Sequence, residues 1–393
     1  MTGTTRTTLD LLQSLVRIPS PNPPGDTCAI AVYIADALRP LHCTVLTLDP
    51  AAKSQAVSVV ATVGQGDPVI MLHAHMDTEP LAENEANGWH VDPYAAAIQD
   101  GRLYGKGSVD DKAVLAAMLH LFMDYAERPE ALKGTLVLVA AAEEEVGGQL
   151  GTRWLADNGH LPQADFIVVG KQTHNRVATA HKGVLRATVR AAGRSVHATI
   201  PDRGVNAITA MAKAVIALEA YHQALASRNY PLVGVPTCNV GVIHGGSTTS
   251  AVPDTCVAYL DRRMIPGEDP EAVKAELTAV IAGVNAAPAQ LTVGDFLVSD
   301  WFSSTCESAL GQCFLTCVRD ALNADPGPIA YLPGSDAQHL RGVCRGEMVI
   351  FGPGSYEVSH AADEYVDLEE FHTAHAILKR YIDETLIDRE KAQ

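Results

Sequence analysis

The pattern of hydrophobic and polar positions divides the chain into three consecutive segments. In the first segment, continuous apolar runs typical of buried strands alternate with stretches of helical periodicity. This alternation predicts a mostly parallel sheet that is covered by helices. The predicted strands are 57–63, 68–73, 134–141 and 166–169, and the predicted helices are 8–18, 27–38 and 111–125.

The second segment, from residue 182 to residue 287, follows a different pattern. Strand 184–191 alternates as half-buried strands do, and it is followed by further strands at 238–243 and 255–263 and by helices at 206–225 and 269–284. From residue 288 the first pattern returns, with a strand at 348–351 and a last helix from about residue 368. We therefore predict an α/β fold. A domain with a mixed, mostly parallel sheet (1–181 and 288–393) carries an inserted, smaller α+β domain (182–287).

Composition and charge narrow the classes of partner. Two cores are expected from 393 residues, of which 47% are hydrophobic. The net charge of -17 repels nucleic acid and anionic membranes, so neither is an expected partner. The N-terminal residues lack a signal-peptide pattern, no apolar stretch approaches the ~20 residues that span a bilayer, and the eight cysteines include no CxxC pair. We expect a cytoplasmic protein with reduced thiols.

The candidate chemistry lies in four short segments that are far apart in sequence: His75-Met76-Asp77, Asp110-Asp111-Lys112, Glu143-Glu144-Glu145 and Ser359-His360. The carboxyl ends of strands in an open α/β sheet line one crevice, so His75, Glu144 and the Gly170-Lys171 turn are expected to converge. Carboxylates and imidazoles are ligands that Zn²⁺ accepts. Each segment alone also fits a strand-end histidine or a solvated acidic turn, but their joint occurrence in this order favours a metal site.

These segments resemble the M20 metallopeptidase family, which includes acetylornithine deacetylase, succinyl-diaminopimelate desuccinylase and aminoacylase. The resemblance covers nearly the whole chain and is carried by residues 72–77 (LHAHMD), 101–112 (GRLYGKGSVDDK), 143–147 (EEEVG) and 352–366 (GPGSYEVSHAADEYV). It implies a catalytic domain with an inserted dimerisation or lid domain, and Zn²⁺, Mn²⁺ or Co²⁺ as cofactor. The metal ligands that it implies are His75 and Asp110 for a first ion, and Asp110, Glu145 and His360 for a second.

The same resemblance implies the roles of five further residues. Glu144 is the general base, and Asp77 orients the imidazole that lies two residues before it. His197 reaches the partner's active site in relatives and stabilises the oxyanion there, so a homodimer is expected. Arg263 is a candidate for gripping a substrate carboxylate, since a guanidinium pairs with carboxylates bidentately. Ser250 stands where the family usually has an asparagine near that carboxylate.

Lys171 is the largest departure from the family pattern. Relatives have a glutamate ligand of the first metal in a GEPT-like turn, where this chain has Gly170-Lys171-Gln172-Thr173. A protonated lysine has no lone pair to donate. Three outcomes are open: the ammonium replaces the first metal, the lysine is carboxylated and regains a ligand oxygen, or it points away while His174 or another group substitutes. We favour the first outcome, and therefore one ion per chain rather than two.

We expect a metallo-amidohydrolase that cleaves the amide bond of a small N-acylated amino acid or a related carboxylate. The alternative is a non-catalytic relative that binds a carboxylate ligand or forms a structural dimer, for which Lys171 and Ser250 are the supporting features. The enzyme is favoured by four intact residues, because a chain that had lost its activity would not need all of them. They are Glu144, Glu145, Asp77 and His360.

Overall fold

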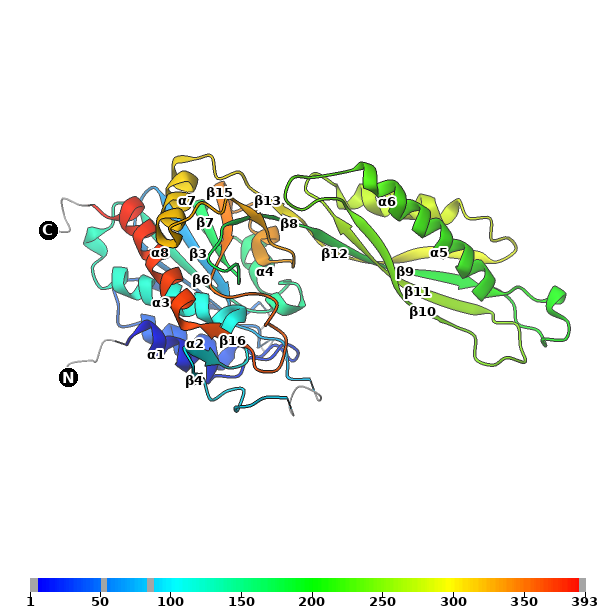
Figure 1. Ribbon diagram of the computed structural model, residues 1–393, viewed down its shortest axis with the longest axis horizontal. Coiled ribbons are helices and arrows are strands. Elements are labelled where there is room, and N and C mark those ends of the chain that lie inside the picture. Colours follow the sequence, from blue (N-terminus) through cyan, green and yellow to red (C-terminus); the bar gives the residue numbers. More distant parts are fainter. Residues whose placement is uncertain (1–5, 51–54, 83–87, 389–393) are drawn as a thin grey trace. The chain divides into compact units, whose positions relative to one another are not determined.

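The computed structural model describes residues 6–50, 55–82 and 88–388. The chain forms two compact units (Figure 1). The first unit consists of Met1–Thr179, Ser304–Tyr331 and Ser335–Gln393, and the second of Ala180–Ser303 and Leu332–Gly334. The second unit is thus inserted in sequence between parts of the first.

The first unit is built around a mixed sheet whose central strands run parallel. The strand order is β1-β2-β6-β3-β7-β15-β8, with the short strands β13 and β14 pairing with β8. Neighbouring strands from β6 through β3 and β7 to β15 are parallel, and those at either side are antiparallel. The predicted mixed, mostly parallel sheet is confirmed. The strands are β1 (Thr44–Leu48), β2 (Ser58–Gly64), β3 (Val69–His75), β6 (Thr135–Ala141), β7 (Ala164–Gly170), β8 (Ala178–His181), β13 (Phe302–Ser303), β14 (Ile329–Ala330) and β15 (Cys344–Phe351).

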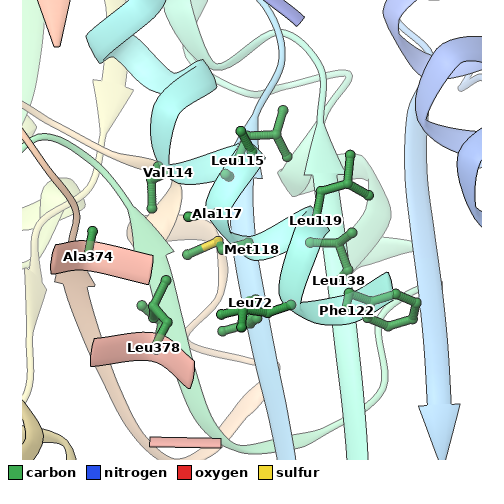
Figure 2. Packing of buried hydrophobic residues seen from close by; sticks show 14 of the residues in the cluster. Leu72, Val114, Leu115, Ala117, Met118, Leu119, Phe122, Leu138, Ala374 and Leu378 are labelled. Atoms are coloured by element: carbon green, nitrogen blue, oxygen red, sulfur yellow. The ribbon is translucent and has the colours of Figure 1, made fainter. Parts of the chain in front are cut away.

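The helices of the first unit bury apolar faces against this sheet and against one another. They are α1 (Thr8–Val16), α2 (Cys28–Leu38), α3 (Ala113–Ala126), α4 (Thr152–Asp157), α7 (Ala309–Leu322) and α8 (Leu368–Leu386). Helix α3 packs against α1, α8 and strands of the sheet. Figure 2 shows Met118 and Phe122 of α3 over Leu72 of β3 and Leu138 of β6, with Leu378 of α8 beside them. A small sheet of β4 (Ala97–Gln99), β5 (Arg102–Tyr104) and β16 (Tyr365–Asp367) completes the unit.

The four parallel strands end side by side at one edge of the sheet. In the strand register, His75 at the end of β3 is opposite Ala141 at the end of β6, and Phe351 of β15 is opposite Gly170 of β7. Each strand is followed by one of the segments that carry candidate chemistry. The parallel direction of the strands therefore brings segments that are distant in sequence to the same edge.

The second unit is a four-stranded antiparallel sheet with two helices packed on it. The strand order is β10-β11-β9-β12, and helices α5 (Ala207–Ala224) and α6 (Pro270–Ala282) contact these strands. The strands are β9 (Gly183–Ala192), β10 (Thr237–Gly245), β11 (Thr255–Met264) and β12 (Gln290–Ser299). Strand β12 lies beyond residue 287, where we expected the inserted segment to end. Its pairing with β9 shifts register between Gly294 and Leu297, which breaks the alternating pattern that identifies a strand.

Within the described residues, none of the helices has the length and apolar character that crossing a bilayer requires.

Candidate metal centre

Asp110 lies at the centre of a cluster of charged side chains at the carboxyl edge of the sheet. It belongs to a turn, Ser108–Lys112, that precedes α3 and displaces the start of this helix from the predicted residue 111 to Ala113. The buried carboxylate of Glu364 accepts hydrogen bonds from the backbone N–H groups of Gly107, Val109 and Asp110, at 3.0, 3.0 and 3.2 Å. Glu364 therefore holds the turn that presents Asp110.

The ammonium of Lys171 points into this cluster. Its Nζ lies 2.6 Å from Nε2 of His75, 2.8 Å from Oδ1 of Asp110 and 3.1 Å from Oε2 of Glu144. The residue is only 3% exposed. Burial lowers the pKa of Lys171, but the carboxylates of Asp110 and Glu144 more than offset this and raise the pKa well above its ordinary value. The two carboxylates therefore favour the charged form of Lys171.

His360 brings a second group of ligand atoms together on the other side of Asp110. Its Nε2 lies 3.3 Å from Oδ2 of Asp110 and 3.3 Å from Oε2 of Glu145. Hydrogen bonds to Asp110 and Glu145 raise the pKa of His360 to about 10. The side chain of His360 is 45% exposed, whereas that of Glu145 is 5% exposed, so this group opens to solvent on the histidine side.

Asp77 orients both His75 and the glutamate pair. The Nδ1 of His75 lies 3.0 Å from the backbone oxygen of Asp77 and 3.5 Å from its Oδ1. The same carboxylate accepts the backbone N–H groups of Glu144 and Glu145, each at 3.1 Å, and the side-chain amide of Asn22 at 2.9 Å. The contact between Asp77 and His75 was expected from the sequence. The hydrogen bonds from the backbone of Glu144 and Glu145 to Asp77 were not.

Among the residues that the structure describes, two groups of donor atoms are compact enough to be considered for a metal ion. In each group the atoms lie within 4.8 Å of one another: His75, Asp110 and Asp111 in the first, and Glu79, Glu145 and His360 in the second. The first group does not fit an ion, because the Lys171 ammonium already contacts the ring nitrogen and carboxylate oxygen that would bind it. The second group fits, since its oxygen and nitrogen donors are ligands that Zn²⁺ accepts.

Several residues of this centre, including Glu79, Gln172 and Tyr331, were not singled out from the sequence. Glu79 contributes to the second donor group, and its position two residues after Asp77 was the available signal. Gln172 donates from Nε2 to Oδ2 of Asp110 at 2.9 Å. The hydroxyl of Tyr331 donates to Oε1 of Gln172 at 3.2 Å. No sequence pattern marked Tyr331, because only the folded chain brings it beside Gln172.

The remaining predicted site residues lie in the second unit, where His197 and Ser250 are on neighbouring segments. The backbone N–H of Ala198 donates to the carbonyl of Ser250 at 2.9 Å, and His197 pairs with Ala251 as an isolated bridge. Nδ1 of His197 lies 2.8 Å from Oγ1 of Thr199. The imidazole of His197 and the side chain of Ser250 are exposed.

Arg263 is distant from Ser250 within the same unit. Ser250 precedes β11, whose first residue is Thr255, and Arg263 is close to the end of this strand. The eight steps from Thr255 to Arg263 correspond to roughly 26 Å at the usual rise per residue. The guanidinium of Arg263 pairs with Asp261, with Nε 2.7 Å from Oδ1. Arg263 and the segment that carries Ser250 therefore lie towards opposite ends of β11.

Comparison with known proteins finds the same family throughout. The sequence profile of Peptidase family M20/M25/M40 matches residues 71–384. An acetylornithine deacetylase from Erwinia tasmaniensis is 30% identical over 316 residues, which cover 79% of this chain and 78% of that protein. A similar protein from Proteus mirabilis, also named acetylornithine deacetylase, is 29% identical over 315 residues, covering 79% of this chain and 78% of its own length.

Solved structures show the same fold at lower sequence identity. An M20 family metallo-carboxypeptidase from Sulfolobus solfataricus superposes with a TM-score of 0.74 at 18% identity, covering 95% of this chain and 98% of its own. A peptidase from Bacillus subtilis, described as a dinuclear metal-binding member of the M20 family, superposes with a TM-score of 0.68 at 16% identity, covering 95% and 96%.

Proposed function

Since the chain belongs to Peptidase family M20/M25/M40 and is a metallo-amidohydrolase, we propose that it hydrolyses the amide bond of a small N-acylated amino acid or a related carboxylate. The observation that carries this proposal is the position of Glu144, whose side chain is 10% exposed and lies beside the cluster that contains Asp110. The similarity to proteins named acetylornithine deacetylase supports an N-acyl amino acid as the substrate class.

Asp110, Glu145 and His360 would hold the catalytic ion, with Glu79 beside them. A bound Zn²⁺, Mn²⁺ or Co²⁺ supplies Lewis-acid polarisation of the amide carbonyl and lowers the pKa of water. Three protein ligands are a sufficient set for catalytic zinc and leave one coordination position open. The exposure of His360 provides a route by which solvent and substrate reach this side of the cluster.

Glu144 acts as the general base. It takes a proton from the attacking water and passes it to the leaving amine. Burial raises the pKa of Glu144, and the Lys171 ammonium opposes this rise. A carboxylate with a raised pKa is a better base near neutral pH than an exposed one. The hydrogen bond from the Glu144 backbone to Asp77 holds the base in position.

The roles of two further residues are proposed from the resemblance to the family. Arg263 would grip the substrate carboxylate by exchanging its present partner, Asp261. The resemblance to the family further suggests that His197 stabilises the oxyanion within a homodimer.

The test is to remove metal from the purified chain with a chelator, add back Zn²⁺, Mn²⁺ or Co²⁺ singly, and assay a panel of N-acyl amino acids for amine release. We expect turnover to disappear on chelation and to return with at least one ion. Glu144→Gln, prepared in parallel, controls for contaminating hydrolases. Ion occupancy without turnover of any panel member would contradict the proposed function and would favour a carboxylate-binding role.

A further inference from the structure

Lys171 and Gln172 act on the two oxygens of Asp110 separately. Lys171 contacts Oδ1 at 2.8 Å, and Gln172 donates to Oδ2 at 2.9 Å. The hydroxyl of Tyr331 donates to the amide oxygen of Gln172, which directs the amide nitrogen towards Asp110. All four residues are at most 5% exposed. Lys171 and Gln172, the two residues that follow β7, thus each donate to a different oxygen of Asp110.

The ammonium of Lys171 has an acceptor for each of its hydrogens. An ammonium carries three N–H donors and no acceptor. Nζ lies within 3.1 Å of one atom from each of His75, Asp110 and Glu144. In the neutral tautomer of His75 whose Nδ1 N–H donates to the backbone oxygen of Asp77 at 3.0 Å, Nε2 accepts the third hydrogen of Lys171. With this tautomer, the donor count of the lysine and the acceptor count of its surroundings match.

The two other outcomes that the sequence left open fit this environment less well. A carboxylated Lys171 would place a further negative group beside Asp110 and Glu144, where like charges repel. A lysine that pointed away would leave the carboxylates of Asp110 and Glu144 buried without this cation. His174 does not substitute as a ligand, since its Nδ1 lies 3.0 Å from Glu370 and its side chain is 57% exposed.

We propose that Lys171 is a built-in cation that takes the place of one metal ion, so that each chain binds a single divalent ion at Asp110, Glu145 and His360. This inference rests on the proposed function only in placing the ion there. Lys171 is a positioning residue: it fixes the carboxylate of Glu144 and Oδ1 of Asp110. The other oxygen, Oδ2, accepts from Gln172 and lies 3.3 Å from Nε2 of His360, so it is the oxygen that faces the proposed ion.

The decisive measurement is the number of ions bound per chain. The protein is stripped with chelator, incubated with excess Zn²⁺, passed through a desalting column and analysed for zinc by mass spectrometry against protein concentration. We expect about one ion per chain for the unmodified protein. Two tightly bound ions, or none, would overturn the proposal.

Substitutions at position 171 sharpen this measurement. Lys171→Glu supplies a ligand oxygen and removes the cation, and we expect occupancy to rise towards two ions per chain. Lys171→Arg keeps the positive charge and is expected to remain at one. Circular dichroism of both variants establishes that they are folded, and if Lys171→Glu is not folded, the occupancy of the unmodified protein and of Lys171→Arg still decides. A folded Lys171→Glu that stays at one ion would contradict the proposal.

Failure of this inference is distinguishable from failure of the proposed function. An occupancy of two with turnover of N-acyl amino acids would overturn the role of Lys171 and leave the hydrolase intact. An occupancy of one without turnover would support the role of Lys171 and contradict the hydrolase. The ion count requires no substrate, so the two results are independent.

Discussion

Each unit buries a network of charged side chains, and the two networks differ in their balance of charge. In the second unit, Arg262 is fully buried and its Nη2 lies 2.6 Å from Oε1 of Glu268. The hydroxyl of Tyr221 accepts from Nε of Arg262 at 3.0 Å. Arg228 pairs with the same Glu268 and with Glu276, at 2.8 Å each. Two guanidinium groups thus face two carboxylates.

The network of the first unit contains more acids than permanent cations. Lys171 faces Asp110 and Glu144, while Glu145 and Asp77 lie close by and contact imidazoles. Buried charges are tolerated when they are paired. A network with matched charges is complete and serves the fold, whereas one with excess carboxylates attracts a further cation. The contrast explains why the first network, and not the second, is the candidate for chemistry.

The largest expected effect comes from removing the general base, Glu144, from the network of the first unit, which has more carboxylates than permanent cations. Glu144→Gln should lower kcat by about 10² to 10⁴-fold, the usual contribution of a general base. Metal content should stay close to that of the unmodified protein, because the proposed ligand is Glu145 and not Glu144. Steady-state kinetics with a substrate from the panel, together with metal analysis, checks both statements. Undiminished kcat in the purified variant would reject Glu144 as the base.

The network of the second unit, in which the charges match, is called the balanced network. Breaking it should lower the free energy of unfolding and leave metal binding unchanged. Glu268→Gln leaves the buried Arg262 without its carboxylate, and breaking such a pair usually destabilises a protein by about 3 to 5 kcal/mol. Urea denaturation followed by circular dichroism measures this loss, while zinc per folded chain should not change. Equal stability of Glu268→Gln and the unmodified protein would show that the pair is not needed for the fold.

The balanced network also predicts a pH dependence of stability. Burial raises the pKa of Glu268, but hydrogen bonds from Arg262, Ile265 and Arg228 lower it more, so the net pKa lies below the ordinary value of 4.5. The carboxylate therefore contributes stability above pH 4.5, and this contribution is lost as pH falls through the lowered pKa. The stability difference between the unmodified protein and Glu268→Gln should shrink on acidification. A difference that grows instead would contradict the sign.

A smaller effect is expected from mixing two inactive variants. If His197 acts in the partner's site, a hybrid of Glu144→Ala and His197→Ala chains has one intact site out of two. With random exchange, half of the dimers are hybrids, so about a quarter of the unmodified activity should return. Native mass spectrometry verifies that subunits have exchanged. Verified hybrids without activity would argue against action of His197 in the partner's site.

The smallest effect is expected at a charge pair on the surface. Arg190 and Asp295 pair in the second unit with side chains that are 51% and 60% exposed. Solvent and salt screen such pairs, and their contribution is usually slight. Asp295→Asn should leave the urea midpoint unchanged within error, which makes it the matched control for Glu268→Gln. A clear shift of the urea midpoint would mean that the exposed fraction of an ion pair does not predict whether the pair contributes to stability.

Much of the fold was predictable because its signals are local. The strands β6 and β3 are buried along almost their whole length, so they are continuous apolar runs in the sequence. Strand β12 was harder to recognise, because a register shift interrupts its alternation and none of its residues is fully buried. The ends of elements were also less certain, as the turn before α3 illustrates.

The sequence by itself determined the types of residue available for chemistry and the order in which they occur. Short motifs around His75, Asp110, Glu144 and His360, and the departure at Lys171, are visible without coordinates. The tertiary structure decided what these groups do to one another. The direction of the Lys171 side chain and its contact with Asp110 depend on two strands and a turn meeting at one edge. The energy of a charge is set by burial and by the distance to its partners, and neither is encoded in a local pattern of residues.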